Sequence, residues 1–160
     1  DIVTMTEFGK TNQPKVVLTW APHPKALPQA VANSFVQWAR QWNCELVVTH
    51  PEGYELADRF VNGIPVIHDQ DQALAGADFV YAKNWSSYQQ YGKVLCDDPA
   101  WMITEEKMSL TNNGHFLHCL PLRRNVVASD QVVNNSLVIP QSNNRLYGAQ
   151  AVLAQILENA

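Results

Sequence analysis

A short segment in the last third of the chain brings together side chains that can bind or polarise a substrate. It contains the imidazole of His118, the thiol of Cys119 and the guanidinium groups of Arg123 and Arg124. Paired guanidinium groups suit carboxylates or phosphate and are poor choices for a buried core. Taken alone, a cysteine is most often a buried apolar residue, and an Arg-Arg pair most often lies on the surface. The segment by itself therefore suggests an anion site but leaves a structural role open.

A metal site is a second interpretation, because His115, His118 and Cys119 lie close together in the sequence. On a β-strand, however, His115 and His118 point to opposite faces, as do His118 and Cys119. Metal ligands must converge on one ion. We therefore expect no metal site here.

Further candidate side chains follow predicted strands. His23 lies between two prolines in a loop after the β-rich run at 15–20, and Lys83 follows the apolar run at 77–82. The prolines prevent a strand or helix from continuing through the loop. Parallel sheets bind ligands beyond the carboxyl ends of their strands, where the strand order reverses. We therefore expect His23, Lys83 and the segment around Cys119 to converge at one edge of a sheet.

The elements that position these residues alternate along the chain. A helix is predicted from Leu27 to Trp42, because apolar residues recur every three or four positions and form one buried stripe of Leu27, Val31, Phe35, Trp38 and Trp42. Other strands are expected at 45–49, 116–119 and 137–139, and other helices after the caps Asp69 and Thr104 and at 146–157. This alternation predicts an α/β fold with a doubly wound, Rossmann-like parallel sheet and helices on both faces. The sequence has neither a Gly-x-Gly-x-x-Gly turn nor a P-loop, so nucleotide binding loses its main support.

Composition limits the class of protein. The 160 residues are 46% hydrophobic and 16% charged, which suits one compact domain, expected at 15–160 after a linker or helix remnant at 1–14. A net charge of -4 argues against a broad surface for nucleic acid or an anionic membrane. The three cysteines are too widely spaced for a disulfide framework, and no apolar run approaches the roughly 20 residues of a membrane span. We expect a cytoplasmic protein that acts on small metabolites.

The segment Phe116–Pro121 resembles the His-Cys-Leu-Pro signature of ornithine carbamoyltransferases. Five other segments are similar, in the same order, to segments of the N-acylornithine branch of that family: Trp20–Pro24, Thr49–Tyr54, Tyr81–Trp85, Leu122–Asn125 and Asn144–Arg145. The resemblance extends from Lys15 to the end of the chain. It implies the carboxyl-terminal, acceptor-binding domain of such an enzyme.

The resemblance also implies a reaction and a set of site residues. Family members transfer the carbamoyl group of carbamoyl phosphate to the side-chain amine of an ornithine derivative, here an N-acyl-L-ornithine, in arginine biosynthesis and without a cofactor. The resemblance implies that the Cys119 thiol and the Leu120 carbonyl receive the amine, and that Arg145 approaches carbamoyl phosphate. The residues that it places around the acceptor are His23, Lys83, Asn84, His118, Pro121, Arg123 and Arg124.

Lys83 separates two branches of this family. Ordinary ornithine carbamoyltransferases have an aspartate there, which meets the free α-ammonium group of ornithine, and a lysine would repel that group. Acylation removes the charge of the α-nitrogen and leaves the carboxylate, so a lysine fits an N-acylornithine. The acetyl-specific relatives have a lysine where this chain has Val127. We therefore favour N-succinylornithine over N-acetylornithine.

Family members hold carbamoyl phosphate mainly with a Ser-x-Arg-Thr-Arg motif in an amino-terminal domain, and these 160 residues contain no such motif. We expect the chain to need that domain, in a homotrimer, for activity, and to be inactive alone. The helix at 146–157 would then be partly exposed or self-associated. The alternatives that stay open are a non-catalytic metabolite-binding domain, an ordinary ornithine carbamoyltransferase and a nicotinamide-dependent dehydrogenase.

Overall fold

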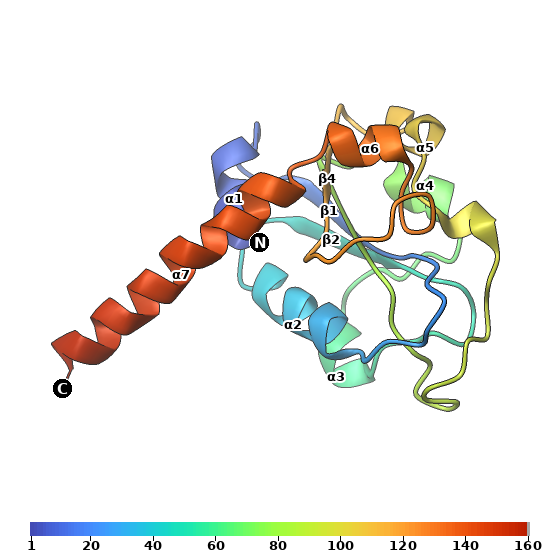
Figure 1. Ribbon diagram of the computed structural model, residues 1–160, viewed down its shortest axis with the longest axis horizontal. Coiled ribbons are helices and arrows are strands. Elements are labelled where there is room, and N and C mark those ends of the chain that lie inside the picture. The colour runs from blue at the N-terminus through green and yellow to red at the C-terminus, as the bar shows by residue number, and fades with distance from the viewer. Residues whose placement is uncertain (160) are drawn as a thin grey trace.

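The computed structural model describes residues 1–159, and a parallel sheet lies at its centre (Figure 1). Its four strands are β1 (Lys15–Trp20), β2 (Glu45–Thr49), β3 (Phe79–Lys83) and β4 (His115–Leu117), in the spatial order β2-β1-β3-β4. Every neighbouring pair is parallel. Because β2 and β3 lie on opposite sides of β1, the winding of the sheet reverses between β1 and β3. Sheets of this type bind ligands at such a reversal.

Helices cover both faces of this sheet. Their bounds are α1 (Ile2–Phe8), α2 (Ala30–Ala39), α3 (Asp58–Val61), α4 (Gln70–Leu74), α5 (Glu105–Ser109), α6 (Asp130–Asn134) and α7 (Val138–Glu158), with a 3-10 turn η1 (Pro99–Trp101). In Figure 1, α2 and α3 lie on one side of the sheet, and α4, α5 and α6 lie on the other. The predicted α/β, doubly wound, Rossmann-like architecture is confirmed.

Side chains of the central strand alternate between two cores. Val16, Leu18 and Trp20 of β1 pack with residues of α1, α2 and α3, whereas Val17 packs with residues of α4 and α6. These four side chains are at most 1% exposed. A parallel strand that is covered on both faces needs such a continuous apolar run, which is why the sequence identified β1.

The short helices α4, α5 and α6, which lie on the same face of the sheet, each begin at a side-chain cap. Asp69 accepts a hydrogen bond from the backbone N–H of Gln72 at 3.0 Å, at the start of α4. Thr104 caps α5 in the same way, and Ser129 caps α6. The caps at Asp69 and Thr104 are confirmed, whereas α6 was not expected.

The strand expected at 137–139 is wrong, because α7 already begins at Val138. Val138 and Ile139 are β-branched and favour a strand locally. Pro140, however, lies in the first turn of α7, where a helix does not need its missing N–H. The carboxyl-terminal helix therefore starts eight residues before the predicted Leu146.

The predicted buried stripe of α2 is also displaced. The residues that α2 buries are Ala32, Phe35, Val36 and Ala39. Trp38, which we expected in the stripe, is 63% exposed. The buried face uses two small alanines that let α2 approach the sheet, whereas the prediction followed the largest apolar side chains.

The long helix α7 leaves the body of the protein, and its carboxyl-terminal half points away from the sheet (Figure 1). Its first half packs on α1, where Asn144 Nδ2 donates to Thr4 Oγ1 at 3.0 Å and to Glu7 Oε2 at 2.8 Å. Farther along, Leu153 and Ile156 are each 59% exposed. The predicted exposure of this helix is confirmed. None of the helices described between residues 1 and 159 combines the length and the apolar character that a membrane span requires.

Candidate functional site

The carboxyl ends of three strands meet at one edge of the sheet. Trp20 at the end of β1 pairs with Lys83 at the end of β3, and the N–H of Ala21 donates to the Lys83 carbonyl at 3.1 Å. On the other side of β3, Tyr81 pairs with Leu117 at the end of β4. The loop after β1, Lys83 itself and the segment after β4 therefore come together, as the strand order requires.

His23 and Arg123 contact each other although they lie 100 residues apart in the chain. The Nε of Arg123 donates to Nε2 of His23 at 3.2 Å, and Nδ1 of His23 lies 2.8 Å from the carbonyl oxygen of Lys25. Arg123 can only donate, so Nε2 accepts and a neutral ring carries its proton on Nδ1, toward the Lys25 carbonyl, although the Lys25 N–H also lies 3.0 Å from this nitrogen. The loop after β1 thus holds Arg123 through an imidazole acceptor.

His118 lies near Lys83 and His23. Burial, followed by the nearby Lys83 and His23 side chains, lowers the pKa of His118 to about 4. The ring nitrogen Nδ1 accepts from the backbone N–H of Leu120 at 3.0 Å. The backbone N–H of His118 donates to Oε1 of Gln141 at 2.9 Å. At neutral pH the ring is therefore uncharged and carries its proton on Nε2. It keeps the segment after β4 folded without adding a positive charge.

The backbone turns sharply at Leu120. Its φ is 42°, in a region that side chains with a Cβ seldom occupy, and the peptide bond to Pro121 is cis. A non-glycine residue held at positive φ is typical of functional sites. The bond from the Leu120 N–H to His118 is part of what holds the turn.

A cleft of about 780 Å³ opens beside this turn. Its walls come from the start of α1, one side of α2, Tyr81 of β3, the segment after β4 and the first half of α7. The sequence-predicted residues that share it are His118, Cys119, Leu120 and Arg145, and others that line it are Phe35, Trp38, Tyr81 and Gln141. The three residues predicted to be catalytic, Cys119, Leu120 and Arg145, thus border one space, although Arg145 comes from a different element.

Asn84 occupies a buried position between β3 and the loop after β1. Its Nδ2 donates to the Ala21 carbonyl at 2.9 Å, and its Oδ1 accepts from the N–H of Leu27 at 3.3 Å. Both ends of this amide are therefore engaged by backbone groups. Asn84 fixes the two ends of the loop that carries His23.

The neighbouring arginines separate. Arg123 reaches His23, whereas Arg124 donates through Nη1 to Asp130 at 3.0 Å and to Asn134 at 2.9 Å, both on α6. Pro121 is exposed and forms part of the turn. The structure therefore brings His23, Lys83, His118 and Arg123 together, and it directs Arg124 toward α6.

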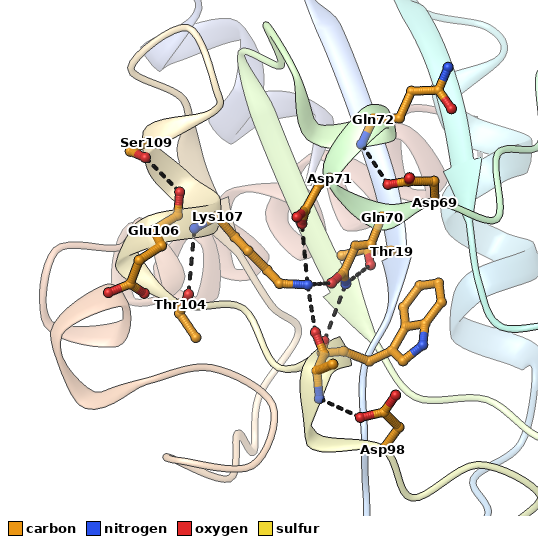
Figure 2. A network of polar contacts seen from close by, with 12 residues as sticks. Thr19, Asp69, Gln70, Asp71, Gln72, Asp98, Thr104, Glu106, Lys107 and Ser109 are labelled. Carbon is orange, nitrogen blue, oxygen red and sulfur yellow. Dashed lines mark hydrogen bonds and ion pairs between the residues drawn. The ribbon is translucent and has the colours of Figure 1, made fainter.

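A polar network supports the end of β1 from the second face of the sheet (Figure 2). Gln70 Nε2 donates to Oγ1 of the buried Thr19 at 2.7 Å and to the Trp101 carbonyl at 3.2 Å. The ammonium of Lys107 donates to Gln70 Oε1 and lies 3.4 Å from Asp71. The network joins β1, α4, η1 and α5. It contacts β1 at Thr19, four residues before His23.

Within residues 1–159, no three side chains of His, Cys, Asp or Glu are grouped so as to hold a metal ion. The ring of His115 packs against Phe8 and Phe79, with centroids 5.9 and 5.8 Å away, at the beginning of β4. His118 follows the end of the same strand.

Tyr81 and Gln141 are among the cleft residues that were not identified from the sequence as site residues. Tyr81 lies in a predicted strand, where an aromatic residue is ordinary. Gln141 bridges the His118 N–H and, through Nε2, Asp1 Oδ1 at 2.7 Å. Nothing in the local sequence distinguishes this glutamine, because its role depends on contacts with segments that lie far away in the chain.

Comparisons with known proteins agree with this geometry. A family model described as aspartate/ornithine carbamoyltransferase, Asp/Orn binding domain, matches residues 28–156. The chain is 50% identical to the N-succinylornithine carbamoyltransferase of Bacteroides fragilis, over 99% of this chain and 51% of the relative. It is 39% identical to the N-acetylornithine carbamoyltransferase of Xanthomonas campestris pv. campestris, over 89% of this chain and 48% of the relative. The chain thus spans about half the length of the curated relatives it matches.

The fold also matches solved structures of N-acetyl-L-ornithine transcarbamylase. A crystal structure of N-acetyl-L-ornithine transcarbamylase matches with a TM-score of 0.83 at 38% identity, over 94% of this chain and 53% of that chain. A mutant of that protein complexed with carbamyl phosphate and N-succinyl-L-norvaline matches with a TM-score of 0.84 at 38% identity, over 94% of this chain and 52% of that chain.

Proposed function

The chain belongs to the aspartate/ornithine carbamoyltransferase family, and we propose that it is the acceptor-binding half of an N-acylornithine carbamoyltransferase. One observation carries this proposal. The turn at His118, Cys119 and Leu120 borders one cleft with Arg145, and the Lys83 ammonium and the His23 imidazole lie close to the same turn. An amine acceptor and a phosphate donor can meet where acceptor groups and cations are adjacent.

The chemistry transfers a carbamoyl group between two nucleophiles. The side-chain amine of the acceptor forms a bond to the carbonyl carbon of carbamoyl phosphate, while the bond from that carbon to the phosphate oxygen breaks. Phosphate leaves with the electron pair, and the proton released from the amine ends on phosphate. The products are an N-acylcitrulline and hydrogen phosphate.

The acceptor amine must first be neutral. A free alkylammonium titrates near 10.4, so only about one molecule in two thousand has a lone pair at pH 7. The Cys119 thiol and the Leu120 carbonyl supply acceptors for the amine N–H groups in a partly buried turn. Holding the amine there directs its lone pair at the carbonyl carbon, and Arg145 stabilises negative charge on the departing phosphate.

The charges around the turn support an acylated acceptor. Lys83 and Arg123 are cations, and His118 is neutral near pH 7 because its pKa is about 4. No carboxylate occupies the position after β3 that would pair with the α-ammonium of free ornithine. An N-succinyl group offers a second carboxylate to these cations, whereas an N-acetyl group offers none. The 50% identity to an N-succinylornithine carbamoyltransferase supports the same preference.

The position of Val127 supports it further. This residue is 2% exposed and packs in the core behind the Arg123–Arg124 segment. A lysine, which the resemblance assigns to acetyl-specific relatives at this position, would place a charge in that core. We propose N-succinyl-L-ornithine as the acceptor, with the enzyme acting in arginine biosynthesis in the cytoplasm as a homotrimer that binds carbamoyl phosphate with its amino-terminal domain.

The test is an acceptor comparison with the full-length protein. Formation of the citrulline derivative from carbamoyl phosphate is measured with N-succinyl-L-ornithine, N-acetyl-L-ornithine and L-ornithine at pH 7 to 8. We expect the highest kcat/KM for the succinyl derivative, a lower value for the acetyl derivative and no detectable turnover of free ornithine. Efficient turnover of L-ornithine would contradict the acceptor, and the absence of turnover with all three would favour a non-catalytic metabolite-binding role.

A further inference from the structure

A tyrosine ring is fixed beneath the cleft. Tyr81 of β3 is 0% exposed, and its ring stacks on Phe35 of α2 with centroids 4.1 Å apart. Both rings line the cleft together with Cys119. Because strand and helix hold the ring from two sides, its hydroxyl occupies a defined position next to the turn that follows β4.

This hydroxyl has no hydrogen-bond partner among the residues that the structure describes. Leaving a buried hydroxyl unpaired costs about 1–3 kcal/mol, and a phenylalanine would fill the same space without that cost. The thiol of Cys119 lies near this hydroxyl, because both residues line the cleft and Cys119 is two residues beyond Leu117, the strand partner of Tyr81. Burial, and then this thiol, raise the pKa of Tyr81, so the phenol keeps its proton and remains a donor. A rotation of the Cys119 thiol, or a molecule in the cleft, would supply the missing partner.

We propose that Tyr81 is a positioning residue that orients the Cys119 thiol toward the acceptor amine. Its O–H donates to one lone pair of Sγ, which leaves another sulfur lone pair facing the cleft to accept an N–H of the amine. A thiol that rotates freely can instead donate its S–H to the amine lone pair and mask the nucleophile. This inference rests on the proposed function, since it concerns the same amine.

The location of Tyr81 in the sheet explains why it acts through the thiol. Tyr81 pairs with Leu117 across β3 and β4, and Cys119 lies two residues beyond Leu117. Residues two apart on a strand share a face, so Lys83 lies on the same side of β3 as Tyr81. Tyr81 thus lies two residues deeper in the sheet than Lys83, at the base of the turn that carries the thiol.

The experiment is a double-mutant cycle in the full-length protein with N-succinyl-L-ornithine as acceptor. Tyr81→Phe is expected to lower kcat about tenfold, as loss of one orienting hydrogen bond does, and to leave both KM values within about twofold. In a Cys119→Ala background the same substitution should change kcat by less than about twofold, because the thiol it orients is gone. The midpoint of thermal unfolding should stay close to that of the wild type, because phenylalanine keeps the ring stacked on Phe35.

Tyr91→Phe serves as the matched control, because this tyrosine is 61% exposed and lies outside the cleft. It should keep the wild-type kcat. An unchanged kcat in Tyr81→Phe would overturn the inference, and so would an equal loss of kcat with and without Cys119, which would mean that the hydroxyl acts on the ligand directly. If the wild-type protein transfers no carbamoyl group, the proposed function fails instead, so the two failures are distinguishable.

Discussion

The charge environment of His118 links the site to the stability of the fold. The unfolded-state pKa of a histidine is about 6.5, and the folded-state pKa here is lowered to about 4 by burial first and then by the nearby Lys83 and His23 side chains. Protonation therefore favours the unfolded chain. The stabilising contribution is fully present above pH 6.5 and is lost as the pH falls toward 4.

We predict that the free energy of unfolding falls by about 3 kcal/mol between pH 7 and pH 4 on account of His118. Urea unfolding at pH 7, 5.5 and 4 measures this loss, and His118→Gln should reduce the pH dependence by a similar amount. His50, whose pKa is also lowered by burial, adds a loss in the same direction. An identical pH dependence in wild type and His118→Gln would contradict the assignment.

The site residues also differ in how well the sequence alone predicts their positions. The signature around Cys119 predicted residues that do share a cleft, because the chemistry and the turn are encoded in one contiguous segment. The separation of Arg123 from Arg124 could not be predicted. Two identical side chains in succession differ only in whether the loop with His23 or the carboxylate of Asp130 lies within reach.

At the scale of elements, the network of Figure 2 couples four segments below the site. Lys107 is the central cation, with its side chain 18% exposed, and it contacts Gln70 and Asp71. We predict that Lys107→Met lowers the free energy of unfolding by about 1–3 kcal/mol, because it leaves the side-chain oxygen Oε1 of Gln70 without its donor.

Chemical denaturation of the full-length protein measures the effect of Lys107→Met. Lys93→Met removes the same charge from an exposed loop, and we expect it to change stability by less than about 0.5 kcal/mol. Equal stabilities of the two variants would show that the network does not hold the elements together.

Elements were predictable where a local pattern had one interpretation. The apolar run of β1 fits only a buried strand. Asp69 and Thr104 are capping residues, and they predict where α4 and α5 begin. Val138 and Ile139 failed as a predicted strand because the helical first turn around Pro140 overrides their propensity. The predicted burial of Trp38 was wrong, because the surface on which α2 packs decides which face of the helix is buried, and the size of its side chains does not.

At the scale of the whole molecule, α7 carries an exposed apolar surface beyond its contact with α1. Val152, Leu153 and Ile156 are 59–60% exposed on this helix. A surface of this type favours association with another apolar surface. We predict that the 160-residue chain alone self-associates as its concentration rises.

Light scattering over a concentration series measures this association. The double substitution Leu153→Gln and Ile156→Gln should return the mass to that of a monomer, and Gln155→Ala should not. A strict monomer at all concentrations, with the amides of α7 well protected from hydrogen exchange, would contradict the prediction.

Lys83 provides the most direct test of the proposed acceptor. The measurement is the kcat/KM of the full-length protein and of its Lys83→Asp variant with N-succinyl-L-ornithine and with L-ornithine. Reversing this charge removes an attraction for the acceptor carboxylates and adds a repulsion, so we predict a loss of about 100-fold or more with the succinyl derivative, together with a shift in preference toward L-ornithine. Unchanged turnover of N-succinyl-L-ornithine by Lys83→Asp would contradict the account.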